Sequence, residues 1–297
     1  SKDDTSSLGG TGILESQSQS FIVHPNVPSQ TQSSISGLGP LVADDVSSST
    51  ITIYLRDEFG NGIENVTPTF EASGSNNIYH PCSPSNQQGK SDCALSSTKA
   101  EIKNLHLTSP IQLVGNSITF THGPAHSLVI TNEPIDTPAM NGLSTTLKIV
   151  DSHENIVSTG IDSNAEIKVE LESGSGILSG ALEAQASAGI VHFNDLKIDL
   201  IGSKQLKFTK EDTSPNNGSI SMNVLSSFFT INLGTPSIDY STIVGTGPVK
   251  ANGMDQANVI IEIKDQGSNP ISNVVPQFHV SGSLNTLSNC TSTNQSG

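Results

Sequence analysis

The sequence has no tryptophan, three tyrosines, nine phenylalanines and only three cysteines among its 297 residues. Exposed aromatic rings on which sugars could stack are therefore scarce, which disfavours carbohydrate binding. Cations are also few, because 13 lysines and arginines face 28 aspartates and glutamates, giving a formal net charge of −15. Nucleic acids and anionic membranes need a basic face, so this charge argues against both as partners. No apolar run approaches the roughly 18 residues that a membrane-spanning helix needs.

Catalytic motifs are equally scarce. The chain contains no Gly-x-Ser-x-Gly elbow, no His-Glu-x-x-His and no phosphate-binding loop. Its eight histidines are scattered, and the close pair His122 and His126 is separated by Gly123-Pro124, which forbids the helix that would align them. We therefore expect a segment that is not an enzyme, with no catalytic residue and no metal site.

The chain repeats itself. Residues 21–89 align without a gap with residues 229–297, an offset of 208 residues, and about a third of the aligned positions are identical. The identities include the pairs Pro28 and Pro236, Pro40 and Pro248, Asp57 and Asp265, Asn61 and Asn269, Phe70 and Phe278, and Cys82 and Cys290. Residues 140–157 repeat the same strand-then-turn pattern around Asp151. The order of modules is therefore A, B, A.

Apolar residues alternate with polar ones along several segments. Ile51, Ile53 and Leu55 follow this period of two, as do Ile167 and Val169, and the pattern is typical of half-buried strands. No stretch shows a sustained helical period, so we predict an all-β protein. The predicted division is a linker or disordered entry over residues 1–20, module A over 21–124, module B over 125–227, and a truncated copy of module A over 228–297.

Two runs near the end of the chain carry a family resemblance. Residues 251–257 read ANGMDQA, a strand follows, and residues 264–271 read KDQGSNPI. They resemble the bacterial immunoglobulin-like group 1 repeat of invasin- and intimin-type adhesins. Asp45 stands where that family prefers glycine, and Ser268 replaces the turn glycine, which lies at Gly267. The resemblance implies a fragment of a larger repeat protein, built from tandem immunoglobulin-like β-sandwich modules of which the last is incomplete.

Two cysteines flank a polar loop. Cys82 and Cys93 enclose ten residues, and we interpret them as a disulfide worth about 2–3 kcal/mol, which implies an oxidising compartment. Zinc is the alternative, but it needs four ligands and His80 is the only nearby addition. Cys290 aligns with Cys82, and its expected mate falls at position 301, beyond the last residue. We therefore expect Cys290 to be unpaired by truncation.

Three turns of related sequence follow the alternating strands. Their shared residues are Asp57, Gly60, Asn61, Asp151, Asn155, Asp265 and Asn269. Aspartate opens such a turn by bonding its own backbone, and glycine or asparagine takes the left-handed position, so we assign these residues a structural role. Calcium is the alternative ligand, and weak calcium binding at module junctions stays open given the acidic charge. We expect no other cofactor.

The resemblance implies a stalk and adhesion segment of a large exported bacterial surface protein, located outside the cell or on its outer surface. The implied partners are neighbouring immunoglobulin-like repeats of the same chain and a host or prey cell-surface receptor, without nucleic acid and without membrane insertion by this segment. If the segment binds a ligand, Tyr79 and His80 on the disulfide loop are the candidate contacts. The alternatives are a ligand- or carbohydrate-binding module, or an accessory region of a large secreted enzyme or phage fibre.

Overall fold

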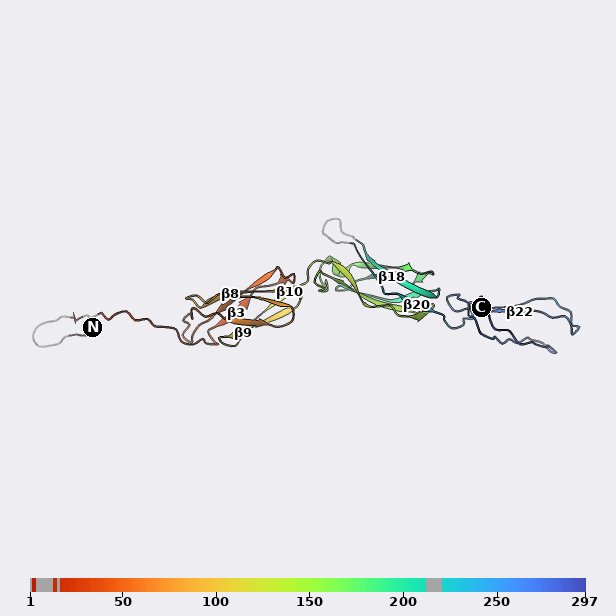
Figure 1. The fold of residues 1–297 in the computed structure, drawn as a ribbon, viewed down its shortest axis with the longest axis horizontal. Coiled ribbons are helices and arrows are strands. Elements are labelled where there is room, and N and C mark those ends of the chain that lie inside the picture. The colour runs from red at the N-terminus through yellow and green to blue at the C-terminus, as the bar shows by residue number, and fades with distance from the viewer. Residues whose placement is uncertain (1, 4–12, 15–16, 212–220) are drawn as a thin grey trace, which may run out of the picture. The chain divides into compact units, whose positions relative to one another are not determined.

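The structure is a computed structural model that describes residues 2–3, 13–14, 17–211 and 221–297. The described chain consists of strands joined by loops, with one 3-10 turn, η1 (Ile161–Asn164), which confirms the all-β prediction (Figure 1). None of its helical segments is long and apolar enough to cross a bilayer. The chain divides into two compact units, one comprising residues up to Leu41 with Asp45–Ser97 and Glu101–Phe120, the other comprising Val42–Asp44, Thr98–Ala100 and Thr121–Gly297.

The predicted linker, residues 1–20, lies mostly outside the described residues. Within it, β1 (Lys2–Asp3) pairs with β2 (Ile13–Leu14) in antiparallel fashion. Residues 17–25 have no regular structure. Three consecutive apolar side chains in that stretch, Phe21, Ile22 and Val23, are 80%, 81% and 80% exposed.

The first unit contains two four-stranded sheets. One has the order β3 (Ser34–Gly37), β5 (Ser48–Tyr54), β8 (Lys90–Ser97), β7 (Asn77–His80), and the other has the order β4 (Leu41–Val42), β10 (Leu113–Thr121), β9 (Ile102–Ser109), β6 (Thr69–Ala72). The alternation predicted for β5 is confirmed, because Ile51 and Ile53 are fully buried together with Leu55 just after the strand. Antiparallel pairing of β5 with both β3 and β8 places these side chains on the inner face.

The second unit contains another pair of sheets. The first has the order β11 (Ser127–Asn132), β13 (Leu143–Val150), β17 (Ile190–Ile198), β15 (Leu178–Ser179). The second has the order β12 (Thr137–Pro138), β20 (Phe229–Asn232), β18 (Gly202–Lys210), β14 (Glu166–Ser173), β16 (Glu183–Gln185), and β19 (Met222–Leu225) also pairs with β18.

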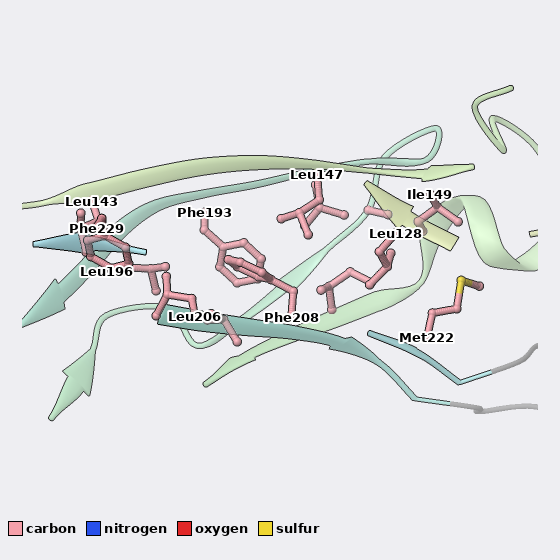
Figure 2. Close-up of a cluster of buried hydrophobic side chains, with 14 of the residues drawn as sticks. Leu128, Leu143, Leu147, Ile149, Phe193, Leu196, Leu206, Phe208, Met222 and Phe229 are labelled. Carbon is pink, nitrogen blue, oxygen red and sulfur yellow. The ribbon is translucent and has the colours of Figure 1, made fainter. Parts of the chain in front are cut away.

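Side chains from both sheets of the second unit meet in one core. Figure 2 shows Leu147 from β13 and Phe193 from β17 pointing toward Leu206 and Phe208 from β18. The rings of Phe193 and Phe208 have centroids 5.5 Å apart. Burial of each such side chain contributes about 1.5–3 kcal/mol, so aliphatic residues with a few phenylalanines hold this sandwich together without tryptophan.

Strand β20 corrects the predicted module boundary between residues 227 and 228. It pairs antiparallel with β18 and parallel with β12, and it adds Phe229 and Ile231 to the core, where they are 4% and 1% exposed. The sequence repeat begins at Phe229, so these residues were assigned to the third module. In the structure they complete the sandwich of the second unit, because β20 pairs with β18 and its apolar side chains enter that core.

The remaining residues reproduce contacts of the first unit at the offset of the sequence repeat. Strands β21 (Thr242–Gly245) and β22 (Val259–Glu262) pair antiparallel. The backbone N–H of Leu55 donates to the carbonyl of Gly89 at 2.8 Å, and Ile263 donates to Gly297 at 2.8 Å. Residues 121–297 all belong to the second compact unit. Their predicted division into two modules therefore stays a prediction.

Candidate functional site

The loop considered for ligand binding is closed by a disulfide. Cys82, just after β7, is bonded to Cys93 on β8, and their Cα atoms lie 4.1 Å apart. Cys290, the remaining cysteine, is a free, half-buried thiol. A disulfide in a small β-sandwich is typical of proteins that fold in an oxidising compartment.

The loop between the two cysteines is also held by its own hydrogen bonds. The backbone N–H of Ser83 donates to the carbonyl of Asp92 at 2.9 Å. The side-chain oxygen of Asn86 accepts from the backbone N–H groups of Gln88 and Lys90 at 2.9 and 3.0 Å. The loop therefore presents one defined backbone conformation.

Tyr79 and His80 lie on β7, which is the edge strand of its sheet. The ring of Tyr79 packs edge-on against Phe70 with centroids 5.4 Å apart, and its hydroxyl oxygen accepts from the backbone N–H of Ala72 at 3.0 Å. His80 Nε2 lies 3.4 Å from Ser96 Oγ. Both side chains are partly exposed, and both make contacts within the unit. A partner could therefore approach β7 as the edge of a sheet, whereas the ring of Tyr79 is not free to move.

The three predicted turns share one internal geometry. In each, aspartate Oδ1 accepts from the backbone N–H groups two and four residues later. These distances are 3.0 and 2.9 Å at Asp57, 2.9 and 2.9 Å at Asp151, and 2.9 and 2.8 Å at Asp265. The left-handed residue precedes the asparagine, with φ of 85° at Gly60 and 63° at both Glu154 and Ser268. The prediction that glycine or asparagine fills this position is therefore wrong for the second and third turns.

The second carboxylate oxygen of each aspartate binds the chain segment that precedes the turn. Oδ2 accepts from one distant backbone N–H in all three cases. The donors are Asn26 to Asp57 at 3.1 Å, Gly123 to Asp151 at 2.7 Å, and Gly234 to Asp265 at 2.9 Å. The last two donors each lie two residues after the end of a strand, β10 and β20 respectively.

The asparagine that ends the turn has a role that the sequence analysis missed. Asn155 Nδ2 donates to the carbonyl of Thr98 at 2.9 Å, and its Oδ1 accepts from the N–H of Ala100 at 2.8 Å, all within the second unit. Asn269 repeats this bidentate contact with the backbone of residues 199–201 at 2.7 and 3.2 Å. Both asparagines are 2% exposed. We call the aspartate and asparagine of such a turn, with the two segments that they bind, the Asp–Asn clamp.

The first turn carries the same residues without the second contact. Asn61 is exposed, and its side chain donates to Asp57 Oδ2 at 3.0 Å. The described part of the chain therefore contains two filled clamps and one in which the asparagine is open to solvent. The signal in the sequence was the fixed four-residue spacing from aspartate to asparagine in all three turns, which a turn alone does not require.

Hydrogen bonds lower the pKa of two of the turn aspartates, Asp57 and Asp151. At Asp57, the side-chain hydrogen bond from Asn61 and three backbone N–H groups lower the pKa below the usual 3.8 against the effect of burial. At Asp151, burial alone would raise the pKa, but the N–H of Gly123 and the amide and N–H of Asn155 outweigh it and lower the pKa below 3.8.

Among the described residues, no group of three or more His, Cys, Asp or Glu side chains is placed to hold a metal ion. Both carboxylate oxygens of Asp151 already accept N–H hydrogen bonds. Weak calcium binding at module junctions stays a prediction.

Two-sheet antiparallel sandwiches with buried inner faces define a β-sandwich protein of immunoglobulin-like architecture. Among solved structures, the chain is similar to the Escherichia coli adhesin FdeC, with 17% identity, a TM-score of 0.48, and 86% of this chain and 80% of that chain covered. It is also similar to InvD of Yersinia pseudotuberculosis, with 16% identity, a TM-score of 0.41, and 82% and 73% covered. A third similar structure is invasin, described as a bacterial integrin-binding protein, with 11% identity, a TM-score of 0.38, and 78% and 48% covered. No family model and no curated protein matches the chain.

Proposed function

We propose that the chain is a non-catalytic segment of an exported bacterial surface protein, in which successive β-sandwich modules act as a spacer in cell adhesion. The filled Asp–Asn clamps carry this proposal. Each one joins a turn to chain segments that precede it by 28 or 31 residues at the aspartate and by 55 to 70 residues at the asparagine. A buried, bidentate connection of this kind ties together chain segments that are far apart in the sequence, which a spacer under load requires.

Charge and covalent chemistry support an extracellular or cell-surface location. The disulfide fits an oxidising compartment. The net charge of −15 makes neighbouring copies repel one another, which suits segments crowded on a surface.

Stretching single molecules between their two ends tests the spacer role. We expect discrete unfolding events. The disulfide keeps the chain between Cys82 and Cys93 from extending, and this segment spans 11 residues at about 3.3–3.6 Å per residue. Reduction should therefore increase the extension gained in one of these events by about 40 Å. A Cys82→Ser, Cys93→Ser variant should show the longer event without reductant. Extension without discrete events would contradict a load-bearing spacer.

A second function, binding of a host or prey cell-surface receptor, is favoured by β7. This edge strand exposes Ile78 and Tyr79 next to the disulfide, and an exposed strand edge can accept a strand from a partner. Beads coated with the chain should adhere to receptor-bearing cells, and Ile78→Lys should abolish the adhesion. Val129→Lys on β11, the edge strand of the other unit, is the matched control. Equal adhesion of both variants would exclude binding through β7.

A further inference from the structure

The segments that lead into the two filled clamps are built alike. Each clamp aspartate accepts a hydrogen bond from a glycine, and the residues three and five positions before that glycine are inward-facing side chains of the last strand of a sandwich. These residues are Phe120 and Ile118 on β10 before Gly123, and Ile231 and Phe229 on β20 before Gly234. All four are buried.

The segment that leads into the open clamp has the same pattern without the burial. Asn26 is the donor to Asp57, and the residues three and five positions before it are Val23 and Phe21. At the offset of the internal repeat these correspond to Ile231 and Phe229. Their exposure is the exception among equivalent positions, because the corresponding side chains Ile231 and Phe229 are buried and a contiguous exposed apolar patch usually marks an interaction surface.

The open asparagine points to the same missing neighbour. Asn155 and Asn269 each donate to one carbonyl and accept from one N–H two residues further on, and both groups lie in a loop that connects the two sheets of a sandwich. The β8–β9 loop supplies residues 98 and 100, and the β17–β18 loop supplies residues 199 and 201. Asn61 has the same amide and the same partner aspartate, but it is exposed.

We propose that Phe21–Val23 forms the last strand of a further β-sandwich module of the same polypeptide, and that Asp57 and Asn61 clamp the loop that connects the two sheets of that module. The partner is thus an immunoglobulin-like module whose second sheet lacks a closing strand and whose loop offers a carbonyl and an N–H two residues apart. Two separate features, an exposed apolar segment and an asparagine side chain without a loop to bind, point to the same occupant. The inference does not depend on whether the segment acts as a spacer or binds a receptor.

The test supplies the chain with a module that accepts such a strand. Residues 1–20 are replaced by a second copy of residues 125–228, so that Phe21 follows Phe228 as Phe229 does in the native order. Hydrogen exchange is then followed by mass spectrometry. We expect the amides of residues 21–23 to exchange freely in the original chain and to become protected in the fusion, to within about tenfold of residues 229–232 in the same molecule.

A second fusion, in which residues 229–234 also replace residues 21–26, reports whether the added copy folds with its own strand. Protection in this second fusion but free exchange at residues 21–23 in the first would overturn the proposal. Absence of protection in both would overturn it too, because a strand at this place would then not complete the added module.

Asn61→Ala tests the clamp separately from the strand. In the first fusion, with Lys197→Arg in the added copy to distinguish its peptides by mass, the amide of Ile201 in that copy should exchange at least about tenfold faster when Asn61 is alanine. Asn269→Ala should do the same to the native Ile201. An unchanged exchange rate of the Ile201 amide in the added copy would show that Asn61 does not bind this loop. Neither readout depends on adhesion or force, so a failed spacer test leaves this result interpretable.

Discussion

Loss of the clamp asparagine should be costly where the clamp is filled and nearly neutral where it is open. Asn155→Ala removes the partner of the Thr98 carbonyl and of the Ala100 N–H at a site that is buried. A typical hydrogen bond contributes about 0.5–1.5 kcal/mol, and a buried polar group left without a partner costs about 1–3 kcal/mol. Because Thr98 and Ala100 are only half-buried, we take about 1–2 kcal/mol for each of the two groups, which gives about 2–4 kcal/mol for Asn155→Ala. Asn269→Ala should cost the same, since it loses an equivalent pair.

Asn61→Ala is the matched control in the same chain. The side chain of Asn61 is exposed and makes one recorded hydrogen bond, so its loss should cost about 0.5–1 kcal/mol or less. Native-state hydrogen exchange at residues 98–100 and 199–201 measures the difference. A cost of about 2–4 kcal/mol corresponds to exchange about 30- to 700-fold faster at 1.4 kcal/mol per tenfold. If all three variants changed exchange equally, the buried bidentate contact would not be what stabilises these loops.

Three further outcomes follow from the structure. Alkylation before reduction should modify only Cys290, and reduction should release two more thiols at a cost of about 2–3 kcal/mol in stability, as judged by mass and denaturant unfolding. Phe208→Ala should destabilise the second unit by about 3–5 kcal/mol in denaturant unfolding, because its ring is fully buried. The folded-state pKa of Asp151 lies below its unfolded value of 3.8, so its contribution to stability is complete above about pH 4–5 and is lost as the pH falls through the folded pKa. Asp151→Asn should flatten that acid dependence.

Each of these outcomes has a control at an exposed site. Phe59→Ala removes the same ring from an exposed position and should change stability by less than about 0.5 kcal/mol. Asp195→Asn, at a carboxylate that is largely exposed, should change stability by less than about 0.5 kcal/mol. Three thiols modified before reduction would disprove the disulfide, and equal effects of Phe208→Ala and Phe59→Ala would disprove the assigned core.

The sheets and their inner faces could be predicted because they depend on local order in the sequence. A period of two in β5 decides which side chains face inward, whatever the rest of the chain does. The sequence could not predict which sandwich β20 joins. The pattern around Phe229 and Ile231 indicates a strand, but it fits the second module as well as the third. Only the long-range pairing of β20 with β18 decides between the two. Lys103 was also beyond a sequence argument. It occupies an inward position of β9, where its ammonium group bonds Glu101 at 2.8 Å and the carbonyl of Ser75 at 2.7 Å.

The Asp–Asn clamp could be predicted only in part. The spacing from aspartate to asparagine is visible in the sequence, and the turn geometry follows from it. The partner of the asparagine was not visible in the sequence, since Asp199 lies 70 residues before Asn269, in a loop that connects the two sheets of the sandwich. Local chemistry identifies a turn, whereas tertiary contacts decide what that turn binds.

The placement of β20 bears on how such a chain can change length by recombination. The strand that closes one sandwich and the clamp residues Asp265 and Asn269 lie on the same repeated stretch of sequence, downstream of the sandwich that they complete. A crossover between two copies therefore moves the closing strand and the clamp together. Gain or loss of a whole repeat would therefore leave Phe229, Asp265 and Asn269 at the same spacing from one another in the sequence.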